Sequence, residues 1–289
     1  MSGRVPPPIP HRPLPPARTV VVPGRGEIFL RDTGGDGPPV LLLHGWLVSA
    51  DLNWCGAYDA LDAAGYRVLA PDHRGHGRGP RTLERFSLAD CAADAAGLLR
   101  ELDAGPAIVV GYSMGGTIAQ LMARDHPELV DGLVLSGTSQ HFQDDRTRRV
   151  WRWMWLLALL LRTAPHRTYA TGFRRLGIAA DEHGAWWLSE MLRSDVRAIT
   201  DAGRELGRFD SRSWLGSITV PAAVVITAGD RSVSPARQRE LAQALRADIS
   251  EVAIDHLELT DRADEFNAAL LEALSTVAGR AARRAAPAA

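Results

Sequence analysis

A serine nucleophile is predicted near the middle of the chain. Ser113 lies in Gly111-Tyr112-Ser113-Met114-Gly115, where the glycines two residues before and two residues after it let the backbone turn sharply. A serine in such a turn holds its hydroxyl above the preceding strand, and the amide dipoles of the following helix point towards it. These residue types at this spacing indicate nucleophilic attack by the Ser113 hydroxyl.

The elements around Ser113 are expected to form a sheet whose strands end at one edge. Ala107–Val110 indicates a short buried strand, and Thr117–Arg124 indicates the helix that leaves it. Pro39–Leu43 is a continuous apolar run, which is typical of a parallel sheet covered by helices on both faces. The other predicted elements are strands Tyr66–Pro71, Leu133–Ser136, Ala222–Thr227 and Ile249–Ile254, an edge hairpin of Thr19–Val22 and Glu27–Arg31, and a helix Ser87–Leu102 capped by Ser87.

Two backbone amides could stabilise an oxyanion beside Ser113. The strand Pro39–Leu43 is followed by His44-Gly45-Trp46, where glycine permits a tight turn that directs the Trp46 N–H into a cleft. The Met114 N–H is the second candidate, and a developing acyl oxyanion needs two donors. His44 has two interpretations, a catalytic base or a histidine packed beneath the turn, and we favour the second.

A glycine-rich segment after the next strand contains two more histidines. His73 and His76 lie in Asp72 to Gly79, and these ligand types could hold a metal ion. A second cluster at ligand spacing is missing, and alternating glycines and arginines are typical of a folded surface loop. We therefore expect no metal site.

Composition excludes several classes of function. The net charge of -1 argues against nucleic acid as the main partner. All 33 basic residues are arginine, so covalent chemistry through a lysine Schiff base is excluded. Cys55 and Cys91 are too few for a disulfide framework and are expected to be buried thiols in the cytoplasm. The proline-rich stretch from Val5 to Pro16 has no apolar core like that of a signal peptide, and it is either a polyproline ligand or a surface leader.

Together these motifs resemble those of the α/β-hydrolase superfamily. The resemblance covers about Thr19 to Leu274, apart from one insertion, and it includes the segments around Gly45, Gly75 and Ser113. It implies an α/β-hydrolase fold, with a mostly parallel eight-stranded sheet flanked by helices and a helical cap after strand six. The expected domains are a proline-rich arm (1–17), a core (18–138 and 217–279), the cap (139–216) and a flexible tail (280–289).

The resemblance also implies the acid and the base. Ala222–Thr227 leads into a segment containing Asp230, which resembles the acid loop of the family. In this fold the triad runs serine, acid, histidine along the chain, and His256 is the only histidine after Asp230. The expected catalytic residues are therefore Ser113, Asp230 and His256. Rival candidates for the acid are Asp255, Glu258 and Asp144.

The chain departs from the usual family residues at two positions. Asp255 precedes the histidine where glycine is common, and Ala263 stands where a proline is usual. The Asp255 carboxylate could stabilise a protonated His256 or could face solvent, and we expect it to face solvent. Because Ser113 replaces the aspartate of relatives that open epoxides or remove halide, those two activities are not expected.

Six tryptophans lie in the insertion between the sixth and seventh predicted strands. Its apolar run from Trp153 to Leu161 is too short to span a bilayer. We expect a helical cap whose apolar face binds the apolar part of a substrate, with Trp153 and Trp187 as candidate substrate-binding residues. Some of these tryptophans are expected only to join the cap to the core.

The expected function is hydrolysis of apolar, short-to-medium carboxylic esters by two-step acyl transfer. The scheme requires no metal or organic cofactor. Alternatives with the same triad are a cofactor-free perhydrolase of the haloperoxidase type, a lactonase, a thioesterase and a C–C bond hydrolase. The perhydrolase group often has proline after the tryptophan, where this chain has Leu47. A non-catalytic ligand-binding member of the fold is the alternative from another class.

Overall fold

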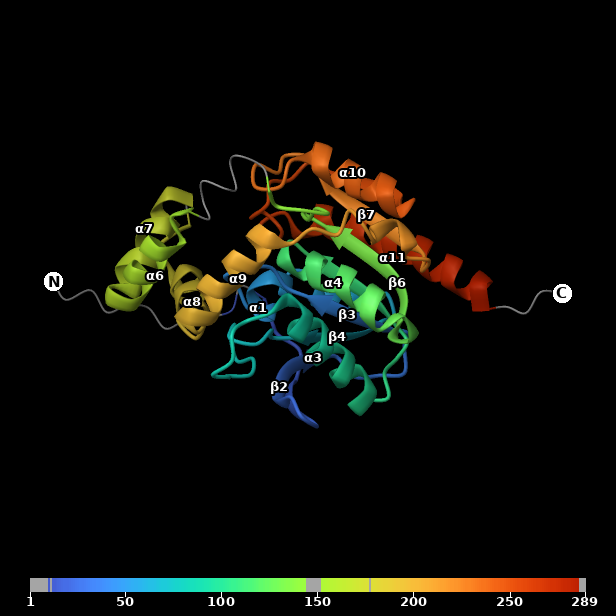
Figure 1. Cartoon of the computed structure of the whole chain (residues 1–289), viewed down its shortest axis with the longest axis horizontal. Helices are drawn as coiled ribbons and strands as arrows, with labels where there is room; N and C mark the ends of the chain where they lie inside the picture. Colours follow the sequence, from blue (N-terminus) through green and yellow to red (C-terminus); the bar gives the residue numbers. More distant parts are fainter. Residues whose placement is uncertain (1–9, 11, 144–151, 177, 286–289) are drawn as a thin grey trace.

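One eight-stranded sheet forms the centre of the computed structural model, which describes residues 10, 12–143, 152–176 and 178–285 (Figure 1). Its strands are β1 (Ala17–Val22), β2 (Gly26–Asp32), β3 (Pro39–Leu43), β4 (Arg67–Pro71), β5 (Ala107–Tyr112), β6 (Val130–Ser136), β7 (Ala222–Thr227) and β8 (Asp248–Val252). They lie in the order β1-β2-β4-β3-β5-β6-β7-β8. Strands β3 to β8 run parallel, and β2 pairs antiparallel with β1 and β4. The expected mostly parallel eight-stranded sheet is confirmed.

Helices cover both faces of this sheet. One face packs against α3 (Leu88–Glu101), α4 (Met114–Asp125) and α10 (Pro235–Leu245). The other face packs against α1 (Ala50–Trp54), α2 (Tyr58–Ala63) and α11 (Ala263–Ala285). All residues of β5 and β7 are buried, which explains why they lack the polar alternation of a strand with one solvated face. The predicted cap of α3 is confirmed, because the Ser87 hydroxyl accepts the Asp90 N–H.

Several element boundaries differ from those expected. Strand β5 continues to Tyr112 and α4 begins at Met114, so Ser113 alone separates strand from helix. Strand β8 ends before the predicted limit at Ile254. Helix α11 continues to Ala285, so the expected flexible tail was wrong for residues 280–285. These residues are alanines and arginines, which favour helix. The last part of that tail (286–289) and most of the proline-rich arm (1–9 and 11) lie outside the described residues.

Four helices form most of the described part of the segment between β6 and β7. They are α6 (Met154–Thr163), α7 (Pro165–Leu176), α8 (Glu182–Met191) and α9 (Val196–Arg208). Helix α9 buries Ala202 and Leu206 in the same apolar cluster as α3 and α4. Helix α8 packs Trp186 and Met191 against Leu52 and Cys55. The rival acid Asp144 and Trp151 lie outside the described residues. Over the ranges that the structure covers, every helix is too short or too polar to cross a bilayer.

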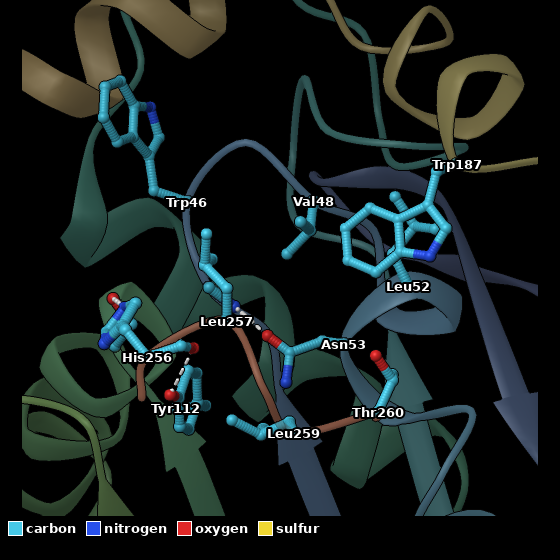
Figure 2. A pocket seen from close by; sticks show the side chains of 12 residues that line it. Trp46, Val48, Leu52, Asn53, Tyr112, Trp187, His256, Leu257, Leu259 and Thr260 are labelled. Carbon is cyan, nitrogen blue, oxygen red and sulfur yellow. Dashed lines mark hydrogen bonds between the residues drawn. The ribbon is translucent and has the colours of Figure 1, made fainter. Parts of the chain in front are cut away.

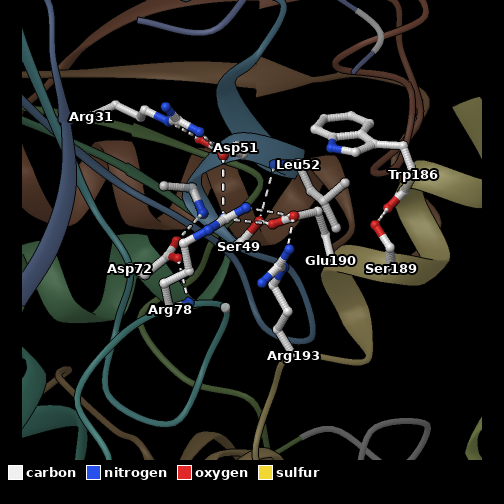
Figure 3. A network of polar contacts seen from close by, with 12 residues as sticks. Arg31, Ser49, Asp51, Leu52, Asp72, Arg78, Trp186, Ser189, Glu190 and Arg193 are labelled. Carbon is white, nitrogen blue, oxygen red and sulfur yellow. Dashed lines mark hydrogen bonds and ion pairs between the residues drawn. The ribbon is translucent and has the colours of Figure 1, made fainter. Parts of the chain in front are cut away.

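An ion-pair network joins α8 to the core (Figure 3). The Arg78 guanidinium donates to both oxygens of Glu190, at 2.7 and 2.6 Å, and also lies 3.4 Å from Asp51. Arg31 donates two hydrogen bonds to Asp51, and Arg193 donates one to Glu190. The Glu190 and Asp51 side chains are only 2% and 1% exposed, so their charges depend on these arginines.

Arg78→Met is therefore expected to destabilise the fold by about 3 kcal/mol, because it removes one partner from two buried carboxylates while keeping most of the alkyl stem. Urea denaturation measures the free energy of unfolding. The matched control is Arg208→Met, since the Arg208 side chain is 75% exposed in its ion pair with Glu205. That change is expected to cost less than about 1 kcal/mol. Equal losses in the two variants would contradict a structural role for the network.

Candidate active site

Ser113 occupies a strained turn between β5 and α4. Its φ is 53° and its ψ is -115°, a conformation that side-chain-bearing residues rarely adopt. A Cβ at Gly111 would lie 2.5 Å from the Gly115 carbonyl oxygen, and a Cβ at Gly115 would lie 1.9 Å from the Leu43 carbonyl oxygen. Both positions therefore exclude a side chain. The two glycines allow the turn that carries Ser113 to the carboxyl ends of the central strands.

His256 and Asp230 meet Ser113 at this edge of the sheet. The Nε2 atom of His256 lies 3.0 Å from the Ser113 hydroxyl oxygen, and its Nδ1 atom lies 2.7 Å from Asp230 Oδ2. Asp230 follows β7 and His256 follows β8, so three strand ends supply the three residues. The structure thus brings together all three residues that the sequence predicted for the triad, with spacing that permits proton transfer from serine to histidine.

The Asp230 carboxylate is held in a fixed orientation. Its side chain is buried, and its Oδ1 atom accepts the N–H groups of Ser232 and Val233, both at 2.7 Å. Its Oδ2 atom accepts the Thr227 hydroxyl at 2.9 Å and faces His256. Gln238 in turn donates to the Thr227 hydroxyl oxygen at 2.8 Å. The roles of Thr227 and Gln238 were not predicted, since these contacts depend on how α10 packs against β7.

Tyr112 fixes the backbone of the histidine loop. Its hydroxyl donates to the His256 carbonyl oxygen at 2.7 Å, and its ring lies 5.1 Å from the imidazole centroid. Burial, with Asp230 and Asp255 nearby, raises the pKa of Tyr112 well above 10. The hydroxyl therefore stays protonated as a donor at neutral pH. From the sequence, Tyr112 was expected only as part of the serine motif.

Asp255 was expected to face solvent, but its side chain is mostly buried. Its side chain is 18% exposed, and its Oδ2 atom accepts the Arg231 Nε–H at 2.6 Å. Its Oδ1 atom accepts the backbone N–H groups of Arg231 and His256. Burial opposes ionisation, but these hydrogen bonds and the Arg231 charge prevail and lower the pKa of Asp255. The Asp255 carboxylate thus holds the backbone of the loop that carries His256. Glu258 accepts the Asp255 N–H.

An apolar pocket opens beside Ser113 and His256 (Figure 2). Its cavity volume is about 60 Å³, within a depression of about 420 Å³ that includes space open to solvent. The remaining lining residues are Gly45, Trp46, Val48, Leu52, Asn53, Tyr112, Trp187, Leu257, Leu259 and Thr260. Of the two tryptophans predicted to bind substrate, Trp187 lines this pocket. The prediction for Trp153 was wrong, because its side chain is 58% exposed just before α6 and is not among the residues that line the pocket.

The two predicted oxyanion donors lie on elements that border Ser113. A Cβ built on Gly45 would lie 3.5 Å from the Ser113 Cβ, which shows how closely the turn before Trp46 approaches the nucleophile. The Gly45 N–H is held by Asn53 Oδ1 at 2.9 Å, and the Trp46 indole donates to the Ile199 carbonyl oxygen at 2.8 Å. Met114 is the first residue of α4, where an N–H has no partner within the helix. The oxyanion role of both amides stays a prediction.

His44 is packed beneath the turn, as favoured from the sequence. It is fully buried, and its Nε2 atom accepts the His73 N–H at 2.9 Å. Burial and the neighbouring His73 and His76 lower its pKa well below 6.5. Burial lowers the pKa of His73 to about 3 and that of His76 to about 4. Across the ranges placed in the structure, no cluster of three or more His, Cys, Asp or Glu side chains could hold a metal ion.

Comparisons with known proteins agree with this architecture. Residues 38–168 match the model of the family described as alpha/beta hydrolase fold. A non-heme chloroperoxidase of Streptomyces lividans is 40% identical over 119 residues, which cover 40% of this chain and 43% of that protein. A non-heme chloroperoxidase of Burkholderia pyrrocinia is 28% identical over 72% of this chain and 80% of its own length. The crystal structure of the enol-lactonase from Burkholderia xenovorans LB400 superimposes with a TM-score of 0.76 at 24% identity, covering 89% of this chain and 100% of that one.

Proposed function

Because the chain belongs to the α/β-hydrolase superfamily, we propose that it hydrolyses carboxylic esters through an acyl-enzyme on Ser113. His256 Nε2 removes the hydroxyl proton as the serine oxygen attacks the ester carbonyl carbon. The tetrahedral intermediate then collapses, and the same proton passes to the departing alkoxide. Water repeats the attack on the acyl-enzyme, with His256 again as base, and releases the carboxylic acid.

The observation that carries this proposal is the continuous contact from Ser113 through His256 to Asp230. The distances of 3.0 and 2.7 Å are those of hydrogen bonds. Asp230 orients the imidazole with its Nε2 atom towards the serine and stabilises the positive charge that the ring acquires. The Trp46 and Met114 amides are the proposed donors to the oxyanion. Every step uses protein groups and water.

The apolar pocket lining favours esters with a short-to-medium apolar acyl group. Each buried methylene contributes about 0.8 kcal/mol, so kcat/KM is expected to rise about fourfold per added carbon while room remains. The cavity volume of about 60 Å³ is small for a long acyl chain. We therefore expect the rise to end at medium length.

Trp187→Ala is expected to move the preferred acyl length upwards, because it removes an indole from the pocket wall. The measurement is kcat/KM for p-nitrophenyl esters of increasing acyl length. Trp153→Ala is the matched control, since Trp153 lies outside the pocket and is expected to leave the profile unchanged. A profile that is flat, or that neither substitution alters, would contradict this assignment of the pocket.

A second candidate is perhydrolysis, in which hydrogen peroxide replaces water and the acyl-enzyme is released as a peracid. The 28% identity to a chloroperoxidase over 80% of that protein favours it. Against it, Leu47 has a φ of 72°, whereas the proline frequent at this position in that group is restricted to about -65°. Assays with acetate, bromide and hydrogen peroxide separate the two reactions, because only perhydrolysis brominates an indicator dye.

A further inference from the structure

Helix α6 presents an exposed apolar surface. It packs onto α9 and α7, and its residues Met154 and Leu161 are buried. On the rest of the helix, Trp155 is 58% exposed, Leu159 49% and Leu160 42%, and Trp153 just before the helix is 58% exposed. We call Trp153, Trp155, Leu159 and Leu160 the α6 face. Trp155 and Leu159 are four residues apart, so they lie one turn apart on the same side of the helix.

This surface is unusual because it gathers four large exposed apolar side chains within eight residues of the chain. The two tryptophan rings lie 6.3 Å apart between their centroids. Scattered exposed apolar residues are normal, but a contiguous group that contains two tryptophans marks an interaction site. In Figure 1, α6 and α7 lie at one end of the molecule, with α9 between them and the sheet. The α6 face is therefore accessible to a large partner.

The charge carried by α6 and α7 has one sign. Residues 152–176 contain five arginines and no aspartate or glutamate, although the whole chain has a net charge of -1. The arginines are Arg152, Arg162, Arg167, Arg174 and Arg175, and all five are exposed. An amphipathic helix with tryptophan and leucine on its apolar side and arginines around it has the composition of helices that lie in a membrane interface.

We propose that the α6 face docks on the surface of an anionic lipid bilayer. Tryptophan and leucine side chains would enter the boundary between headgroups and acyl chains, and the arginines would pair with lipid phosphates. A second copy of this chain fits less well, because a two-fold contact would place the same arginine-rich surfaces against each other. In this mode of binding, the protein lies on the surface of the bilayer and requires no membrane-spanning helix.

Helix α7 connects this surface with the pocket. Its residues Tyr169 and Phe173 pack in the same apolar cluster as Val48 and Trp187, which line the pocket beside Ser113. A bilayer bound at α6 would therefore lie one helix away from the pocket wall. The lipid binding itself does not depend on the proposed hydrolase activity.

The test is co-sedimentation of the full chain with vesicles of phosphatidylcholine alone or of equal parts phosphatidylcholine and phosphatidylglycerol. We expect binding to the anionic vesicles. High salt is expected to weaken it, because salt screens the attraction between the arginines and the lipid phosphates. Trp155→Ser with Leu159→Ser is expected to reduce the partition coefficient at least about tenfold. Arg162→Gln with Arg167→Gln is expected to reduce binding to the anionic vesicles and to remove most of the salt dependence.

The matched control is Leu83→Ser, because Leu83 is 91% exposed but lies outside α6 and is expected to bind like the wild type. Circular dichroism checks the folding of each variant, and the arginine pair tests the same surface if the apolar pair fails to fold. Failure of the wild type to bind anionic vesicles would overturn the proposal. Equal binding by all variants would overturn it as well, and so would a dimer in solution that the apolar pair dissociates.

Discussion

Replacing Ser113 with alanine is expected to lower the kcat for ester hydrolysis by about 10⁶-fold, the size of effect seen when a triad nucleophile is removed. The variant loses the atom that forms the acyl-enzyme, so only attack by unactivated water remains. The backbone strain at Ser113, with its φ of 53°, and the exclusion of side chains at Gly111 and Gly115 both serve to present this one hydroxyl. The measurement is kcat with a short p-nitrophenyl ester.

Ser250→Ala is a matched control, because this serine lies on β8 and its hydroxyl bonds to Glu272. It is expected to keep wild-type activity. An alanine variant at Ser113 with more than about a tenth of wild-type turnover would remove the serine from the mechanism. If the wild-type protein hydrolyses no ester yet binds apolar esters, the non-catalytic alternative gains support.

The strands and the three residues of the proposed triad could be predicted because their signals are local. The turn at Ser113 needs glycines at fixed spacing, and the buried strands are continuous apolar runs such as Pro39–Leu43. Asp230 and His256 were reached through the order of motifs along the chain. Each of these signals can be read from the order of residues along the chain. That order was enough to predict that Ser113 lies close to Asp230 and His256.

Two of the wrong predictions, those for Trp153 and Asp255, concern contacts between distant segments. Trp153 and Trp187 are alike in sequence, but only the packing of α6 on α9 and of α8 on the core decides that Trp187 reaches the pocket. Asp255 was expected in solvent because its partner Arg231 lies 24 residues away. The helical extension to Ala285 was missed for another reason, since an alanine and arginine sequence fits a tail as well as a helix.

The acid of the triad can be tested against its neighbour. Asp230 is buried and accepts hydrogen bonds from two backbone amides and from Thr227, so its carboxylate is fixed before substrate binds. Asp230→Asn keeps the shape of the side chain but can present N–H groups to His256 Nδ1. The imidazole would then adopt the tautomer that carries its proton on Nε2, and it could not accept a proton from Ser113. We expect kcat to fall about 10⁴-fold with the fold unchanged.

Asp255→Asn is the matched control, because it removes the other carboxylate near His256 by the same substitution. An asparagine oxygen can still accept the N–H groups of Arg231 and His256, so the loop is expected to keep its position. What is lost is a negative charge beside the base, so this substitution is expected to change the pH profile of kcat/KM at most. A large loss of kcat in Asp255→Asn together with a small loss in Asp230→Asn would assign the acid to Asp255.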